Sequence, residues 1–368
     1  MALICATAVA VFPATISKAD QTRNNQWHLR YLKVSEAHEL SQGEGVTVAV
    51  IDTGVDPHPD LRNNLLSGTV TGGGGSGNGR QDSDPGGHGT GMAGLIAAHG
   101  RGGNGALGIA PKAKLLPIRN GKRDHETDDT AEAIEWAVSK NVDIISVSSG
   151  GGSSPRLNAA LRAAFEADII VVAAAGNRPG DFLIQFPAAT EGVVAVGAID
   201  QRGEHADISV TGKRLSLTAP GVDIYSTSVD GRYRSGTGTS PSTAIVAGAA
   251  ALVRSKFPEL SAEEVVHRLT ATADDKGAPG RDEEYGYGVL NLVKALTADV
   301  PPLERGAEPS ASADPDPTQS QPAAAPEQED KANSSTVLVG VLAALVVLGL
   351  LVVLAVVLLA RRRQQPRS

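Results

Sequence analysis

Between residues 46 and 298 the chain alternates short apolar segments with longer segments of helical periodicity, and this pattern constrains the fold more than any other feature. Short runs rich in Val, Ile, Leu and Ala are typical of buried strands. Strands separated by helices predict a mostly parallel sheet with helices on both faces. We therefore expect an α/β fold of three layers. The expected strands cover residues 46–51, 113–118, 142–147, 169–174 and 193–199.

The segments between these strands carry apolar residues at helical spacing, and several contain helix-start signals. Pro155 lies near the start of one helix, and Ser261 opens another through a Ser-x-x-Glu capping box with Glu264. His99 is expected at the end of a helix that Gly100 terminates. The predicted helices cover residues 90–99, 128–140, 154–167 and 243–257, with a further one from residue 261.

Three separate motifs each place a residue of catalytic type in a special backbone setting. VAVIDTG ends a predicted strand at Asp52, GHGTG sets His88 between glycines, and GTGTS brings Ser240 after a glycine-rich turn. A serine hydroxyl becomes a nucleophile when a neighbouring imidazole takes its proton. A carboxylate can hold that imidazole in the required tautomer. The three motifs therefore predict an Asp-His-Ser triad.

A fourth motif, AAAGN, ends at Asn177, whose side-chain amide can donate to an oxyanion together with the Ser240 N–H. Asp52, Ser148 and Asn177 all stand at or just after the ends of predicted strands, where parallel sheets place their active sites. Each motif alone has a simpler explanation as a turn, a loop or a helix cap. Their combination on one sheet favours the catalytic interpretation.

Through these motifs, residues 45–298 resemble the subtilisin family of serine endopeptidases, the subtilases. The order Asp, His, Ser along the chain is the order of that family. The resemblance implies a subtilisin-like fold, hydrolysis of peptide bonds through an acyl-enzyme, and the oxyanion role of Asn177. It also implies a substrate-binding edge that pairs with substrate main chain and a pocket for the residue before the scissile bond. The edge would be Ser148, Ser149 and Gly150, and the pocket would be lined by Ala174 and Gly176.

The residues after Ser240 depart from that family, which usually has Met-Ala and a later Pro. Pro241, Ser242 and Ala244 stand in those places. We expect Pro241 at the first position of a helix, where proline is tolerated. The N–H of Ser240 is retained, so we expect an intact nucleophile.

The two ends of the chain differ in composition from its middle. Residues 1–19 resemble a signal peptide, because a short apolar run is followed by the cleavage-site pattern SKA. Residues 20–45 form a short N-terminal extension with enough apolar surface to dock on a domain. After the peptidase domain, 46–298, a Pro/Ala/Ser-rich disordered linker is expected over 299–335.

Residues 336–360 are predicted to form one transmembrane helix, since they contain no charged residue and no proline. The basic tail 361–368 predicts a cytoplasmic C-terminus. We therefore expect a single-pass protein of the cell membrane with an extracytoplasmic catalytic domain.

This layout resembles the mycosins, membrane-anchored proteases associated with type VII secretion in actinobacteria. The resemblance implies polypeptide substrates, the membrane and the secretion complex as partners. Two alternatives stay open: a structural stabiliser of that complex whose catalysis is dispensable, and a general cell-surface subtilase.

Charge and cysteine content limit other partners and cofactors. The formal charge of −8 and the lack of a basic stripe argue against nucleic acid. The single cysteine, Cys5, permits no intramolecular disulfide. No cofactor is expected to be required, and the sequence does not assign calcium sites.

Overall fold

A seven-stranded parallel sheet forms the centre of the molecule, in the strand order β2-β5-β1-β6-β7-β8-β9. The computed structural model describes residues 18–73, 76–101, 104–120 and 127–303. Because all these strands are parallel, their carboxyl ends meet at one edge of the sheet. The strands are β1 (Thr47–Asp52), β2 (Thr69–Thr71), β5 (Lys114–Asn120), β6 (Ile144–Val147), β7 (Ile170–Ala174), β8 (Val194–Ile199) and β9 (Leu215–Pro220).

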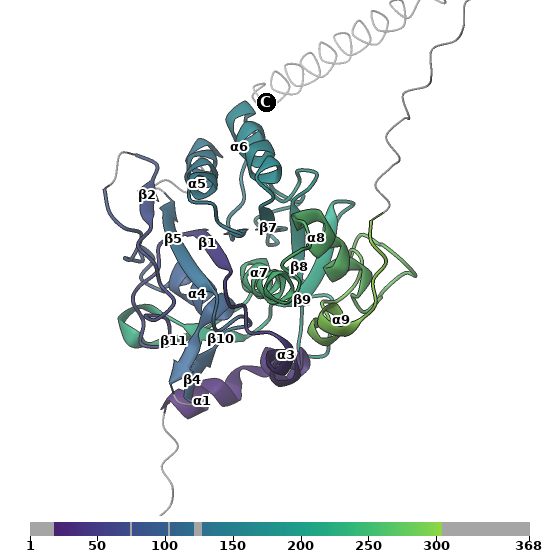
Figure 1. Cartoon of the computed structure of the whole chain (residues 1–368), viewed down its shortest axis with the longest axis horizontal. Coiled ribbons are helices and arrows are strands. Elements are labelled where there is room, and N and C mark those ends of the chain that lie inside the picture. Colours follow the sequence, from purple (N-terminus) through teal and green to yellow (C-terminus); the bar gives the residue numbers. More distant parts are fainter. Residues whose placement is uncertain (1–17, 74–75, 102–103, 121–126, 304–368) are drawn as a thin grey trace, which may run out of the picture. The chain divides into compact units, whose positions relative to one another are not determined.

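Both faces of the sheet are buried, which explains why the strands are apolar throughout. Along β1, Val48 and Val50 join one apolar cluster, whereas Ala49 and Ile51 join the other. The first cluster also contains residues of α4 and α7, and the second contains residues of α5 and α6 (Figure 1). The predicted three-layer α/β fold is therefore confirmed. The helices are α4 (His88–Ala97), α5 (Thr127–Ser139), α6 (Pro155–Glu166) and α7 (Thr239–Lys256).

Helix α7 begins at Thr239, four residues before the predicted start at residue 243. The Asn177 side chain caps this start, because its Oδ1 accepts the Thr239 N–H at 2.9 Å. Pro241 is thus the third residue of the helix, and its expected place at the first position was wrong. The first N–H groups of a helix have no intrahelical acceptor, so a proline in the first turn removes no helical hydrogen bond.

Helix α4 is also displaced from its prediction over residues 90–99. It begins at His88 and ends at Ala97, because Ala98 adopts an extended conformation. The next residues form β3 (His99–Arg101), which pairs with β4 (Asn104–Leu107) in an antiparallel hairpin. The predicted position of His99 at a helix end was therefore wrong.

The predicted helix starts at α6 and α8 (Ala262–Ala271) are confirmed. At α6, Ser154 Oγ accepts the Leu157 N–H at 3.1 Å, and Pro155 occupies the first turn. At α8, Ser261 and Glu264 form the reciprocal capping box. The remaining elements are α9 (Leu292–Thr297), the turn η1 (Val229–Gly231) and a second hairpin of β10 (Ile224–Thr227) and β11 (Tyr233–Gly236).

The first described residues fold back onto the sheet domain as α1 (Lys18–Asn25), α2 (Trp27–Tyr31) and α3 (Val34–Leu40). Gln26 is fully buried, and its side chain exchanges two hydrogen bonds with the main chain of Leu107, at 2.9 and 3.0 Å. Trp27 and Leu32 belong to the same apolar cluster as α4 and α7. This segment is therefore part of the packed domain.

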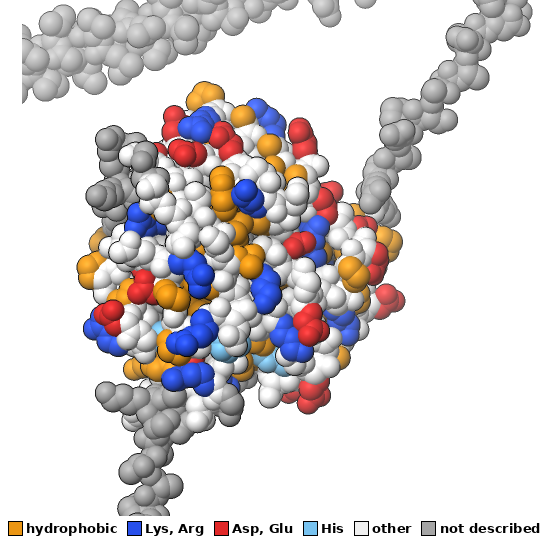
Figure 2. Space-filling model, turned by 60° about the vertical axis from the view of Figure 1, so that its left-hand side comes forward, with side chains coloured by type: hydrophobic (Ala, Val, Ile, Leu, Met, Phe, Trp, Pro, Cys, Tyr) orange, Lys and Arg blue, Asp and Glu red, His pale blue; other side chains and the backbone are white. Residues whose placement is uncertain are grey.

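Charged side chains of both signs are interspersed with apolar ones on the face drawn in Figure 2. In the portion of the chain that the structure describes, no helix has the length and apolar character needed to cross a bilayer. The predicted transmembrane helix 336–360 and basic tail 361–368 lie outside the described residues, as do the linker beyond residue 303 and the signal peptide up to residue 17.

Candidate active site

Asp52 and His88 form a directly bonded pair at the carboxyl end of β1. Asp52 is the last residue of that strand and His88 the first residue of α4. His88 Nδ1 lies 2.7 Å from Asp52 Oδ1. A carboxylate accepts but does not donate, so this bond places the imidazole proton on Nδ1 and leaves the lone pair on Nε2. The other carboxylate oxygen, Asp52 Oδ2, is buried and has no hydrogen-bond partner among the described residues.

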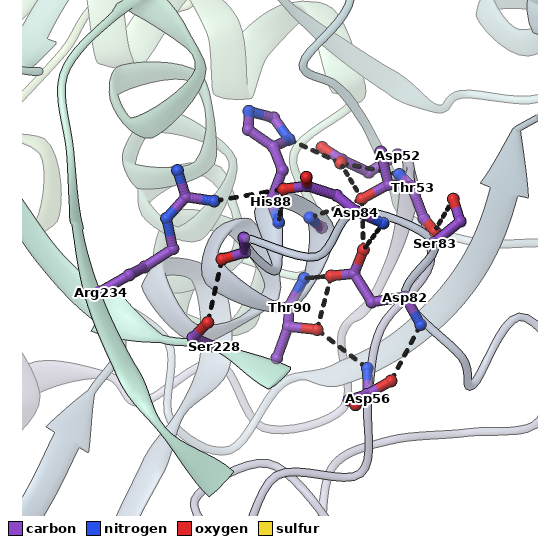
Figure 3. A network of polar contacts seen from close by, with 12 residues as sticks. Asp52, Thr53, Asp56, Asp82, Ser83, Asp84, His88, Thr90, Ser228 and Arg234 are labelled. Carbon is purple, nitrogen blue, oxygen red and sulfur yellow. Dashed lines mark hydrogen bonds and ion pairs between the residues drawn. The ribbon is translucent and has the colours of Figure 1, made fainter. Parts of the chain in front are cut away.

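Three side chains hold the N-terminus of α4, and with it the main chain of His88 (Figure 3). Asp84 Oδ2 accepts the His88 N–H at 2.8 Å, Thr53 Oγ1 accepts the Gly89 N–H at 3.0 Å, and Asp82 Oδ2 accepts the Thr90 N–H at 2.8 Å. These are the N–H groups that a helix itself cannot satisfy. Two carboxylates at this end also interact favourably with the helix dipole.

Asp82 links the capping groups to each other. It accepts a hydrogen bond from the hydroxyl of Thr53 at 2.6 Å and another from the hydroxyl of Thr90 at 2.7 Å. Thr53 in turn donates its main-chain N–H to Asp52 Oδ1 at 2.8 Å. The strand that ends in Asp52 and the helix that begins with His88 are therefore joined through shared hydrogen bonds as well as through the pair itself.

Glycine is required where this helix approaches the strand. A Cβ on Gly89 would lie 2.1 Å from the carbonyl oxygen of Gly54. No side chain can be accommodated at that distance, so the glycine after the histidine allows the close approach of α4 to the end of β1.

The charges around His88 favour its protonated form. The Asp52 carboxylate raises the pKa of His88 most, through its charge and its hydrogen bond, whereas burial acts in the opposite direction. Asp84 adds a smaller increase, and the guanidinium of Arg234, which pairs with Asp84 at 3.7 Å, lowers the His88 pKa. The net effect is a pKa above the ordinary value of 6.5.

Ser240 is the second residue of α7 and lies at the end of β6. Its hydroxyl donates to the carbonyl oxygen of Ser148 at 3.1 Å. Among the described residues, no hydrogen bond joins Ser240 to His88. His88 and Ser148 line one cleft of about 700 Å³; Ser240 is not part of its lining and is connected to it through the bond to Ser148. The side chain of His88 is 30% exposed there.

Asn177 lies beside the first turn of α7. Because Oδ1 of Asn177 accepts the N–H and the hydroxyl of Thr239, its Nδ2 is oriented away from that helix. Neither this Nδ2 nor the N–H of Ser240 has a hydrogen-bond acceptor among the described residues. Gly238 makes room for the arrangement, since a Cβ there would lie 3.1 Å from Asn177 Oδ1. Both donors therefore belong to the first turn of α7 or to the side chain that caps it, and the same turn carries the Ser240 hydroxyl.

The predicted substrate-binding edge lines the cleft. Ser148, Ser149 and Gly150 contribute to its wall together with Asp52 and His88. After Gly150, Gly151 pairs with Phe186 in an antiparallel bridge. The predicted edge therefore runs along the cleft and ends at this bridge.

Ala174 and Gly176 flank the end of β7 but do not line this cleft. Gly176 instead donates its N–H to Thr239 Oγ1 at 3.2 Å, which ties the end of β7 to the first turn of α7. The structure thus places all nine predicted site residues at the carboxyl edge of the sheet, and it bonds the pocket residue Gly176 to Thr239, the neighbour of Ser240 in the chain.

Sequence reasoning missed Thr53, Asp82, Asp84 and Arg234, which surround His88. Asp82 and Asp84 stand in a short polar segment, DSDPGG, that is typical of a solvated loop. Two acidic residues just before a predicted helix start were the available signal, because acidic side chains are favoured at helix N-termini. In the described part of the chain, no group of three or more His, Cys, Asp or Glu residues is placed to hold a metal ion.

Comparison with known proteins gives the same assignment over most of the chain. A model of the subtilase family matches residues 43–288. The thermostable alkaline protease of Halalkalibacterium halodurans is 39% identical over 277 residues, which are 73% of this chain and 73% of that protein. Subtilisin DY of Bacillus licheniformis is 39% identical over 262 residues, and this match covers 92% of that protein.

Two solved protease structures are also similar to this chain. The crystal structure of MycP1 with its N-terminal propeptide removed superposes with a TM-score of 0.68 at 31% identity and covers 75% of this chain and 98% of that one. MycP3, a protease from the type VII (ESX-3) secretion system, gives a TM-score of 0.65 at 34% identity, with coverage of 74% and 88%. The fold is therefore subtilisin-like. This chain belongs to the subtilase family and is a subtilisin-like serine endopeptidase.

Proposed function

We propose that Asp52, His88 and Ser240 are the catalytic triad of this endopeptidase. The observation that carries the proposal is the 2.7 Å bond between His88 Nδ1 and Asp52 Oδ1, which leaves the basic Nε2 facing the cleft that Ser148 borders. The Ser240 hydroxyl is bonded to Ser148, which borders the same cleft, and we propose that it turns toward His88 when substrate binds. Catalytic hydrogen bonds are often absent without substrate and form in the Michaelis complex.

In the proposed reaction Ser240 Oγ attacks the carbonyl carbon of the scissile bond while His88 Nε2 takes its proton. His88 then returns that proton to the leaving amine, and the acyl-enzyme is hydrolysed by water in the reverse sequence of proton transfers. Asp52 stabilises the imidazolium that forms between these steps. Protein groups supply every role in this scheme, so we propose that no cofactor takes part; calcium sites are not assigned.

We propose that Asn177 Nδ2 and the N–H of Ser240 bind the developing oxyanion. Both donors lack a partner among the described residues, and both lie at the start of α7, where the helix dipole favours negative charge. We also propose that the main chain of Ser148, Ser149 and Gly150 pairs with the substrate, with Ala174 and Gly176 beside the residue before the scissile bond.

Single and double substitutions test whether the triad acts as a unit. Ser240→Ala and His88→Ala are each expected to lower kcat by several orders of magnitude, and the double variant is expected to be hardly slower than either single one. Hydrolysis of a casein substrate, with circular dichroism as the control for folding, provides the measurement. If the factor by which the double variant lowers kcat equals the product of the two single factors, Ser240 and His88 act independently, which would contradict the proposed triad.

For the biological role, we propose a mycosin that processes substrates of type VII secretion. The similarity to MycP1 and MycP3 supports this role at about 30% identity, and so does the predicted signal peptide, linker and membrane anchor. On this proposal the protein lies at the cell membrane with an extracytoplasmic catalytic domain, and its partners are exported polypeptides and the secretion complex.

The alternatives differ in what Ser240→Ala does in the cell. N-terminal mass spectrometry of secreted proteins from cells carrying the wild-type and Ser240→Ala chains tests this directly. We expect specific N-termini to disappear in the variant while export continues. Unchanged N-termini, combined with loss of export when the gene is deleted, would instead identify a structural stabiliser. A general surface subtilase, which the 39% identity to an alkaline protease favours, would leave type VII substrates unprocessed in both strains.

A further inference from the structure

We infer that Gln185 determines substrate specificity by restricting the pocket before the scissile bond to small side chains such as those of Gly, Ala and Ser. This inference rests on the proposed function, because it takes the surroundings of Gly150 and Gly176 as that pocket. It concerns side chains that belong to neither the proposed triad nor the proposed oxyanion site.

The loop 178–186 starts directly after Asn177 and returns across the gap between the ends of β6 and β7. At its end, the Gln185 N–H donates to the carbonyl oxygen of Ala175 at 3.3 Å. Phe186, the next residue, exchanges two main-chain hydrogen bonds with Gly151, at 2.9 and 3.2 Å. Gln185 is therefore fixed between the two segments that would enclose the substrate residue.

The side chain of Gln185 lies against Gly150. A Cβ on Gly150 would be 2.6 Å from Gln185 Cβ and 3.1 Å from its Cγ. Real Cβ atoms do not approach that closely, so the glutamine occupies the space directly above this glycine. A large substrate side chain that enters beside Gly150 has to displace it.

Asp181 lies against the other glycine of the proposed pocket, Gly176. A Cβ on Gly176 would lie 3.0 Å from Asp181 Oδ2 and 3.1 Å from Asp181 Cβ. That carboxylate is held in place, since Oδ2 accepts the Asn177 N–H at 2.7 Å. Asp181 is thus a positioning residue for Asn177 as well as a wall, which makes Gln185 the better residue to change.

A hydrogen bond of Gln185 and the extent of the cleft both agree with a proposed pocket that the Gln185 side chain partly occupies. Gln185 Nε2 donates to the carbonyl oxygen of Leu183 at 3.0 Å, which holds its side chain within the loop. The large cleft next to His88 includes Gly150 in its lining but reaches neither Ala174 nor Gly176. The cleft therefore extends from His88 to Gly150 but not to Gly176, and Gln185 lies against Gly150.

The chemistry of a tight pocket gives the expected selectivity. Each methylene that a pocket must accept or reject changes kcat/KM by about 10–200-fold. Displacement of Gln185 also breaks its bond to Leu183. We therefore expect the wild-type protein to prefer alanine over phenylalanine at this position by at least about 10-fold.

The test measures the rate at which Ser240 is modified by three peptidyl diphenyl phosphonates. The probes are succinyl-Ala-Ala-Pro peptides that end in the phosphonate analogue of alanine, phenylalanine or lysine, and intact-protein mass spectrometry follows the reaction. We expect the wild-type protein to react fastest with the alanine probe. Gln185→Gly is expected to raise the phenylalanine-to-alanine rate ratio by about 10-fold or more, and Gln185→Ala by less.

Phe182→Gly is the matched control, because it introduces a glycine into the same loop at a side chain that is 80% exposed. It is expected to leave the rate ratio unchanged. Gln185→Glu, which keeps the size and adds charge, is expected to retain the preference for alanine over phenylalanine. Phe182→Gly therefore measures the effect of loop flexibility on the rate ratio, and Gln185→Glu measures the effect of charge. The remaining effect of Gln185→Gly is due to the size of the side chain.

Three outcomes would overturn the inference. The first is a wild-type protein that reacts as fast with the phenylalanine probe as with the alanine probe, or with neither. The second is a fastest reaction with the lysine probe, which would assign charge selection to Asp181. The third is an equal shift in Gln185→Gly and Phe182→Gly. A small fluorophosphonate that fills no pocket serves as the reference: if it also leaves Ser240 unmodified, the proposed function has failed rather than the role of Gln185.

Discussion

The imidazole of His88 is held by Asp52, and its main chain is held by Asp84, so both ends of the residue are fixed. These two attachments fix the orientation of the His88 imidazole although the residue stands at the first position of a helix. A helix N-terminus alone would disfavour a protonated histidine. The Asp52 carboxylate outweighs that effect, because charge and hydrogen bonding together raise the His88 pKa.

The His88 pKa provides a prediction with a definite sign. Protonated His88 cannot take the Ser240 proton, so kcat/KM is expected to fall as pH drops through a value above 6.5. Asp52→Asn removes the largest contribution to the raised pKa, so the titration of His88 is expected to move to lower pH. NMR titration of ¹³C-labelled histidine measures this shift, and Asp84→Asn is expected to give a smaller shift in the same direction. An unchanged or higher pKa in Asp52→Asn would contradict the account.

Asn177 gives a second prediction. Asn177→Ala removes the proposed Nδ2 donor and is expected to lower kcat by about 10²–10³ with little change in KM, as loss of the corresponding asparagine does in subtilisin. Steady-state kinetics on a peptide substrate provide the measurement. The Asn177 side chain also caps α7, so the melting temperature must be recorded alongside. A proportional rise in KM at constant kcat would assign Asn177 to substrate binding instead.

The residues with catalytic chemistry were predictable because each follows a buried strand or a glycine motif. Thr53, Asp82 and Asp84 were not, since their roles depend on bonds to residues brought near by the fold, such as the bond that the Thr90 N–H donates to Asp82. A carboxylate in a polar loop has the same sequence pattern whether it faces solvent or caps a helix.

At the scale of elements, the active site is assembled from the N-termini of α4 and α7 and the carboxyl ends of β1, β6 and β7. The five predicted strands agree closely with β1, β5, β6, β7 and β8, because buried parallel strands are apolar throughout, whereas β2 and β9 were not predicted. Helix starts were predicted well only where the cap is local, as at Ser154 and Ser261. The start of α7 was missed because Asn177, which is distant in sequence, caps it. The start of α4 was missed because its caps combine the distant Thr53 with two nearby acidic residues of a polar loop, Asp82 and Asp84.

Removal of a cap at the start of α4 should affect stability and catalysis together, because the same hydrogen bonds hold His88. Asp82→Ala is expected to destabilise the protein by about 1–3 kcal/mol, since it leaves the Thr90 N–H and two hydroxyls without their acceptor. It is also expected to lower kcat more than it changes KM, because His88 loses its fixed position. Urea unfolding and steady-state kinetics measure the two effects.

Ser261→Ala is the control for this prediction. It removes a helix cap at α8, far along the chain from the site, and is expected to cost about 1 kcal/mol in stability without a change in kcat. Asp82→Ala could lower stability and, like Ser261→Ala, leave kcat unchanged. In that case the hydrogen bonds around α4 support the fold and not the position of His88.

At the scale of the whole molecule, the segment from α1 to α3 packs into the same core as the helices of the active site. It carries His28, which is fully buried and whose two ring nitrogens have no hydrogen-bond partner among the described residues. Burial, with a smaller contribution from Arg30, lowers the pKa of His28 to about 3. The folded domain therefore holds this histidine in its neutral form.

This buried histidine predicts loss of stability in acid. The unfolded chain binds a proton near pH 6.5 and the folded chain only near pH 3, so the contribution is complete above pH 6.5 and is lost as pH falls between these values. The slope from one such group is at most about 1.4 kcal/mol per pH unit. His28→Leu is expected to flatten the dependence of the unfolding free energy on pH, and Leu32→Met is not. Urea unfolding at pH 7.5, 5.5 and 4.5 provides the measurement; equal slopes in the wild type and His28→Leu would contradict the prediction.

The most direct test of the catalytic account is the rate at which a fluorophosphonate modifies Ser240, followed across pH by intact-protein mass spectrometry. We predict one adduct per chain, located at Ser240, with a rate that falls as pH drops through the raised pKa of His88. The adduct should be absent in Ser240→Ala and form far more slowly in His88→Ala. A folded wild-type protein that remains unmodified, or one modified at a rate that His88→Ala does not change, would contradict the assignment of Asp52, His88 and Ser240 as one catalytic unit.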